Sequence, residues 1–306
     1  MRTLVPFVAL GLCAPLIAQQ PFKSGVELVR IPVNLTQGDK PVEPGVVTAA
    51  DFTVTEDGVE QQVLFFRRES LPLSICVVFD TSSSMGQGSL LPFATAAMRQ
   101  VLTRLLPEDE VAVIAFAGKP QLLAPWTPAP DITKLTLNLQ AYGSTSLTDA
   151  ALHALTIMNG ARNPRPVILL ITDGEENSSR VTLSELVTTR RQSETQVYAF
   201  HVLSPARAVG RVGPGGGDGP AVTGPPAVEV LPRLIGDSGG FAYRATSGGG
   251  AAALASAFID DLRFQYTLGY SPIKPLDGKY RRVKVEVKKR GFRIRHRGGY
   301  LALPMP

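Results

Sequence analysis

One carboxylate and four hydroxyls lie close together in the segment "FDTSSSMG", residues 79–86. The apolar run of residues 71–78 precedes them, so they come where a buried strand is expected to end. The spacing of two between Asp80, Ser82 and Ser84 favours convergence on one side of a loop. Taken alone, the segment fits a serine nucleophile, a phosphate-binding loop, part of a metal site, or a loop whose serines bond the backbone.

Two later segments add oxygen donors at the ends of other expected elements. "GSTS" at residues 143–146 precedes an expected helix, and "TDG" at residues 172–174 ends the apolar run "VILLI". Ligands of open parallel sheets bind at the carboxyl ends of the strands. Thr145 adds a hydroxyl there and Asp173 adds a second carboxylate. Five oxygen side chains suit a small hard cation, and with only two of them anionic a dication keeps affinity for water or an outside carboxylate.

These segments resemble the von Willebrand factor type A (VWA) domain with its metal-ion-dependent adhesion site (MIDAS). The matching motifs are "DTSSSM", "GSTSLTDA" and "LLITDG", and the resemblance covers roughly residues 71–261. It implies hydroxyl ligation by the serines and threonine, direct or water-mediated ligation by the aspartates, and completion of the site by an Asp or Glu of an unknown protein partner. The implied ligands are Asp80, Ser82, Ser84, Thr145 and Asp173. Thr148 is an alternative to Thr145. The implied metal is Mg²⁺, and Mn²⁺ or Ca²⁺ would fit the same oxygens.

The flanking segments resemble a second family. "DFTVTEDGVEQQVLFFRRES" before the domain and "YTLGYSP" with "DGKYRRVKVEVKKRGFRIRHRGGYLA" after it look like the exported VWFA-related Acidobacterial domain family. This resemblance implies an architecture and export, and it names no substrate.

The elements between the flanks predict an α/β fold. Five short apolar segments, typical of strands buried on both faces, alternate with helical patterns. The alternation predicts a Rossmann-like VWA domain at residues 71–261, with a central, mainly parallel sheet between helices. With 44% apolar and 19% charged residues, the composition permits a packed core. Residues 205–227, rich in Gly and Pro, are interpreted as a surface loop.

The segments on either side of this block read as β-structure. Residues 24–70 and 262–303 alternate apolar and polar side chains, and we expect them to pair into one small β domain. Asp57-Gly58 predicts a tight hairpin turn. A second, half-exposed hairpin is expected over residues 279–297, with its turn at residues 289–291.

The first 18 residues predict a cleaved signal peptide. Arg2 precedes an apolar run from Leu4 to Leu16, which is shorter than the ~20 residues of a membrane-spanning helix. Cleavage near Ala18 would send the protein to the periplasm, the cell envelope or the medium. Cys76 would then be the sole cysteine, in a strand-like run typical of a small core residue.

Positive charge concentrates near the end of the chain. Residues 279–297 hold ten Lys or Arg and one Glu. This segment could contact anionic envelope components, but a solvated strand face is the default interpretation. A further interpretation is that the segment complements the acidic remainder of the chain. Few aromatic residues are interleaved with the charges, and export also argues against nucleic acid. Glu175 and Glu176 are interpreted as parts of a solvated loop.

A serine hydrolase is the remote alternative. "GDSGG" at residues 236–240 copies a protease motif around Ser238, but glycines also fit the end of a helix there. None of the three histidines has the sequence context of that protease family, and His201 is expected mid-strand. No GxxxxGK[ST] phosphate loop is present.

Two functional hypotheses remain ahead of the hydrolase. The leading one is an exported, non-enzymatic protein-binding module of adhesion type, whose metal site receives a partner carboxylate. The alternative is an envelope structural or assembly module in which the metal only stabilises the loops.

Overall fold

The computed structural model describes residues 28–38, 40–204, 227–246 and 250–303. Its larger part contains a six-stranded sheet in the order β11-β10-β9-β6-β7-β8, parallel except for the edge strand β8. The strands are β6 (Leu73–Asp80), β7 (Glu110–Phe116), β8 (Pro120–Pro128), β9 (Arg165–Thr172), β10 (Gln196–Leu203) and β11 (Ala242–Thr246). β6 and β9, at the centre, are buried at almost every position, as their apolar runs predict.

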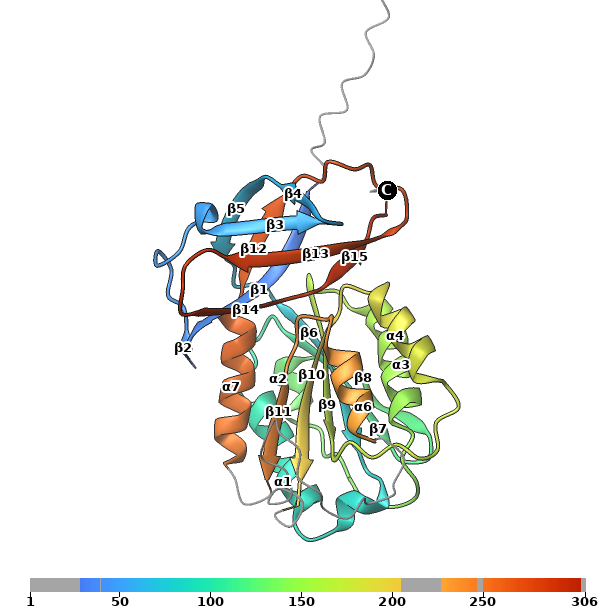
Figure 1. Ribbon diagram of the computed structural model, residues 1–306. Coiled ribbons are helices and arrows are strands. Elements are labelled where there is room, and N and C mark those ends of the chain that lie inside the picture. Colours follow the sequence, from blue (N-terminus) through green and yellow to red (C-terminus); the bar gives the residue numbers. More distant parts are fainter. Residues whose placement is uncertain (1–27, 39, 205–226, 247–249, 304–306) are drawn as a thin grey trace, which may run out of the picture.

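Helices cover both faces of this sheet (Figure 1). One face packs against α1 (Leu90–Leu102) and α7 (Ala251–Arg263), and the other packs against α3 (Leu147–Ile157), α4 (Leu183–Arg191) and α6 (Ala227–Ile235). The short α2 (Ala129–Ile132) follows β8. The expected Rossmann-like arrangement of a mainly parallel sheet between helices is confirmed.

A β-sandwich lies at the amino ends of the parallel strands (Figure 1). Its two sheets have the orders β14-β1-β12-β5, with β2 beside β1, and β15-β13-β3-β4. The early strands are β1 (Val29–Gln37), β2 (Lys40–Pro41), β3 (Phe52–Glu56), β4 (Val59–Gln61) and β5 (Val63–Arg68). The late strands are β12 (Tyr266–Tyr270), β13 (Tyr280–Val287), β14 (Phe292–His296) and β15 (Gly299–Leu301). β1 pairs with both β12 and β14, so the chain's two β segments form one core, as expected.

One of the two predicted hairpins is present in the structure, and the prediction of the other was wrong. β3 and β4 are joined by Asp57 and Gly58, which have φ values of 47° and 82°, as a two-residue hairpin turn requires. The strands of the 279–297 segment do not pair with each other. β13 pairs with β3 and β15, whereas β14 pairs with β1 in the other sheet. The turn at residues 289–291 therefore crosses the edge of the sandwich.

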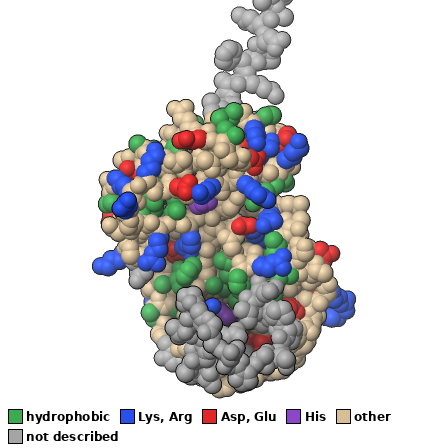
Figure 2. Space-filling model, in the orientation of Figure 1, with side chains coloured by type: hydrophobic (Ala, Val, Ile, Leu, Met, Phe, Trp, Pro, Cys, Tyr) green, Lys and Arg blue, Asp and Glu red, His purple; other side chains and the backbone are tan. Residues whose placement is uncertain are grey.

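The basic residues of this segment are largely neutralised. At least six of the ten pair with a carboxylate of the described residues: Lys279, Arg281, Lys284, Lys289, Arg295 and Arg297. Figure 2 shows lysine and arginine side chains interspersed with acidic ones over the sandwich. This arrangement favours the interpretation in which the segment complements acidic residues of the same molecule.

Two predicted features lie outside the described residues. These are the signal peptide at residues 1–18 and all but the last residue of the Gly/Pro-rich loop at residues 205–227. Within the described ranges, no helix has both the length and the apolar character needed to span a bilayer.

Candidate metal centre

The first loop brings three of the five candidate ligands together at the carboxyl end of β6. Asp80, the last residue of that buried strand, is 0% exposed. One carboxylate oxygen of Asp80 accepts a hydrogen bond from the Ser82 amide at 2.8 Å, and the Oγ atoms of Ser82 and Ser84 lie 3.0 Å apart. Both serines are buried, and Ser83 between them is exposed. Alternate side chains therefore converge as their spacing predicted.

The second loop packs directly against the first. The Tyr142 amide donates to the Thr81 carbonyl at 2.8 Å, and the Ser83 amide donates to the Gly143 carbonyl at 3.0 Å. Gly143 has a φ of 73°, a conformation that glycine adopts without steric cost. Thr145, which this loop carries, is 1% exposed. These backbone bonds fix the second loop beside the serines of the first.

The third loop begins at Asp173, immediately after β9, and contacts both of the others. Thr172, the last residue of β9, donates its hydroxyl to the second carboxylate oxygen of Asp80 at 2.5 Å. The Thr145 amide donates to Asn177 Oδ1 at 2.8 Å, and the Thr145 carbonyl accepts from the Asn177 amide at 3.0 Å. Asp173 itself is 6% exposed. All five candidate ligands are thus buried on three interlocked loops at one edge of the sheet.

The electrostatics of this edge fit a cation. Burial raises the pKa of Asp80 to about 6, and the nearby charge of Asp173 also raises it, although hydrogen bonds from Ser82 and Thr172 act the other way. Among the described residues, no arginine or lysine forms an ion pair with Asp80. Two carboxylates with three hydroxyls form a hard oxygen donor set, which suits Mg²⁺, Mn²⁺ or Ca²⁺ better than a softer metal.

Glu176 holds the loops in place, and the expectation of a solvated side chain was wrong. Its carboxylate accepts hydrogen bonds from the amide and hydroxyl of Thr148 and from the amide and hydroxyl of Ser179, at 2.7–3.0 Å. Glu176 thereby caps the start of α3 and occupies the hydroxyl of Thr148, which leaves Thr145 as the better candidate ligand. No local pattern signals this contact, because Glu176 and Thr148 are 28 residues apart.

The two residues that a serine hydrolase would need, Ser238 and His201, both make hydrogen-bond contacts with the backbone. Ser238 is 2% exposed, and its hydroxyl donates to the Ile235 carbonyl at 2.8 Å and accepts from the Val197 amide at 3.0 Å. His201 lies in β10, and its Nε2 is 3.0 Å from the Asp173 carbonyl oxygen. The "GDSGG" segment thus joins the end of α6 to the sheet.

The fold and the interlocked loops define an α/β domain with a cluster of buried oxygen side chains at one end of its parallel sheet. Residues 75–176 match the family model of the von Willebrand factor type A domain. The chain therefore contains a VWA domain, as the three motifs predicted.

Curated relatives match the same part of the chain. Inter-alpha-trypsin inhibitor heavy chain H3 of Bos taurus is 29% identical over 131 residues, which are 38% of this chain and 15% of that protein. A UPF0353 protein of Mycolicibacterium paratuberculosis is 33% identical over 114 residues, 34% of each chain. The chain thus spans about 15% of the length of the heavy chain and about a third of the bacterial relative.

Solved structures resemble the molecule more distantly. A von Willebrand factor type A protein from Catenulispora acidiphila has a TM-score of 0.47 and 14% identity, with 92% of this chain and 73% of that chain covered. Proximal thread matrix protein 1 from the mussel byssus, with a zinc-occupied MIDAS motif, has a TM-score of 0.49 and 15% identity, with coverage of 68% and 50%.

Proposed function

We propose that this protein is a metal-dependent protein-binding module of adhesion type. Asp80, Ser82, Ser84, Thr145 and Asp173 would hold a divalent cation, with Mg²⁺ as the first choice. The observation that carries the proposal is the interlocking of three loops that buries two carboxylates and three hydroxyls at one sheet edge. The presence of a VWA domain supports the same role.

The charge of the donor set indicates what kind of partner would bind. Asp80 and Asp173 would balance a dication without making the site anionic. When bound, the cation would offer a coordination position to an oxygen from outside, and a partner's Asp or Glu is the side chain that matches it. Each of the two ligands would then strengthen binding of the other, because they share one site.

The candidate site and the β-sandwich lie at opposite ends of the parallel sheet. The β-sandwich lies at the amino ends of the parallel strands, whereas the candidate ligands lie at their carboxyl ends (Figure 1). A partner could therefore approach the site without meeting the sandwich. Export to the periplasm, envelope or medium is part of the proposal and is supported by the signal-like residues 1–18.

A comparative pull-down from envelope extract tests this function. Immobilised wild type in Mg²⁺ should retain a protein that chelator releases and that renewed Mg²⁺ restores, and Asp173→Ala should not retain it. Ser83→Ala is the matched control, because that exposed serine is not a candidate ligand. Circular dichroism would show that each variant is folded. Retention that survives both chelator and Asp173→Ala would contradict the proposal.

The structural-metal alternative predicts a different result. If the cation only stabilises loops, chelation should lower the melting temperature strongly while a partner bound through the β-sandwich stays bound. A hydrolase would be labelled by a serine-reactive probe, and the burial of Ser238 argues against such labelling.

A further inference from the structure

A second polar site lies between α4 and α6, away from the candidate metal centre. It is a surface cavity of about 320 Å³. Arg191 and Asp237 line one end of it. Arg191 comes shortly before the first residue of β10, and Asp237 comes shortly before the first residue of β11. This end therefore lies toward the amino ends of the strands, whereas Asp173 follows the carboxyl end of β9.

The cavity has more positive than negative charge. Arg191 donates to Asp237 Oδ2 at 2.8 Å, and the buried guanidinium of Arg190 lies 3.9 Å from the same oxygen. Arg233 lines the cavity without a hydrogen bond or ion pair to any described residue. The lining residues thus hold two guanidinium groups and one carboxylate, and the buried Arg190 adds a third guanidinium beside Asp237.

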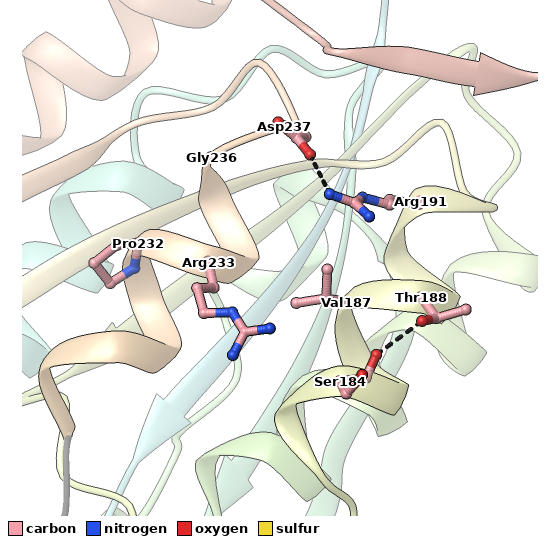
Figure 3. A pocket seen from close by; sticks show the side chains of 8 residues that line it. All are labelled: Ser184, Val187, Thr188, Arg191, Pro232, Arg233, Gly236 and Asp237. Carbon is pink, nitrogen blue, oxygen red and sulfur yellow. Dashed lines mark hydrogen bonds and ion pairs between the residues drawn. The ribbon is translucent and has the colours of Figure 1, made fainter. Parts of the chain in front are cut away.

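The two lining arginines approach the space from opposite walls. Figure 3 shows Arg233 extending from α6 toward α4 and Arg191 extending from α4 toward Asp237. Val187 and Pro232 add apolar surface, and the hydroxyl of Thr188 is turned to the Ser184 carbonyl at 2.9 Å. The remaining donors that face the cavity are therefore mainly guanidinium N–H groups.

The helix dipole alone does not explain why both arginines line the same cavity. Arg191 and Arg233 lie in the last turns of α4 and α6, where the helix dipole favours a cation. That preference places no demand on where the side chain points. Arg99, in the last turn of α1, meets the same preference and lines a different groove without a second arginine.

We propose that the α4–α6 cavity binds a phosphoryl group, as inorganic phosphate or as a small phosphate monoester. Guanidinium groups match phosphate oxygens in charge and in the geometry of paired hydrogen bonds. The excess of guanidinium groups over carboxylates in and beside the cavity favours an anionic ligand. The volume admits a monoester with a small organic part, which would lie against Val187 and Pro232.

Calorimetric titration of the metal-free full chain tests this site separately from the metal centre. Inorganic phosphate should bind saturably, and Arg233→Gln should weaken it by roughly tenfold or more, because a charge-assisted donor is lost. Arg233→Gln breaks no described hydrogen bond, so the fold should persist. Arg99→Gln is the matched control and should leave phosphate affinity unchanged.

The competing outcomes are separable. A tighter fit of glycerol 3-phosphate than of inorganic phosphate would identify a phosphorylated compound as the ligand, and equal affinities would identify the free anion. The proposal is overturned if neither compound binds saturably at millimolar concentration, or if Arg233→Gln and Arg99→Gln weaken binding equally.

Discussion

Two threonines that follow Gly143 have different roles in the structure. Thr145 is buried between the first and third loops, whereas Thr148 donates its hydroxyl to Glu176 at 3.0 Å. The sequence placed both in one motif and left the choice open, because a spacing of three residues does not reveal which hydroxyl a distant carboxylate will take. By contrast, the convergence of Ser82 and Ser84 was predictable, since alternation within one loop is a local property.

Glu176 should contribute measurably to stability at the residue scale. Burial acts to raise its pKa, but hydrogen bonds from Ser179 and Thr148 outweigh burial and hold that pKa below its ordinary value. Glu176→Gln keeps the shape and removes the charge that these donors bond. We expect the free energy of unfolding to fall by about 1–3 kcal/mol, measured by urea denaturation.

Glu60 provides the matched control for that substitution. It is exposed on β4, and its side chain makes no hydrogen bond or ion pair to a described residue, so Glu60→Gln should change the unfolding free energy by about 0.5 kcal/mol or less. Equal effects of the two substitutions would show that the Glu176 contacts do not stabilise the loops.

At the scale of elements, the sequence predicted where strands form more reliably than which strands pair with each other. β13 and β14 both show the alternation of half-buried strands, and this pattern is identical whether the two pair with each other or join different sheets. β8 was not predicted, because Pro120, Pro125 and Pro128 argue against a strand. It forms as an antiparallel edge strand with irregular register, where the missing amide donors can be tolerated.

The contact between β13 and β14 should depend on pH through His296. Its Nε2 accepts from the Val285 amide at 3.1 Å, and its Nδ1 lies 2.7 Å from the Arg297 carbonyl oxygen, so the ring is bonded as the neutral form. Burial lowers the pKa of His296, against the opposing effect of the Arg297 carbonyl. The unfolded chain therefore binds the proton more readily than the folded one.

The expected consequence is a loss of stability in mild acid. The contribution of His296 is fully present above about pH 6.5, the ordinary pKa of histidine, and declines as the pH falls through the lowered folded value. Urea denaturation between pH 5 and pH 8 measures it. His296→Gln should flatten this dependence, and an unchanged slope in the variant would assign the effect to other groups.

At the scale of the whole molecule, a buried polar seam joins the VWA domain to the sandwich. Asn34 of β1 donates to the carbonyl and a carboxylate oxygen of Asp261 in α7, both at 2.7 Å. Gln265 donates to Asn34 at 2.9 Å and to Tyr198 at 3.1 Å. Arg295 Nη2 forms an ion pair with Asp261 and contacts both of its carboxylate oxygens, at 2.6 and 2.7 Å. The sequence predicted that the two β segments would pair, but not these contacts, which join residues up to 231 positions apart.

This seam should make the two parts unfold together. Asn34→Ala removes one hydrogen-bond partner from Gln265 and one from each of the Asp261 carbonyl and carboxylate groups, so we expect the free energy of unfolding to fall by about 1–3 kcal/mol. Scanning calorimetry should show one transition in the wild type and one at lower temperature in the variant. The exposed Arg30→Ala on the same strand should have little effect. Two separate transitions in the wild type would contradict a cooperative seam.

The central claim is that the three loops form one divalent-cation site. Titration calorimetry of Mg²⁺ into chelator-treated, dialysed protein tests it most directly. The account predicts one saturable site in the wild type and in Ser83→Ala, and affinity weakened by about tenfold or more in Ser82→Ala and Asp173→Ala. An absence of saturable Mg²⁺, Mn²⁺ or Ca²⁺ binding in the wild type, or equal affinity in Ser82→Ala and Ser83→Ala, would contradict it.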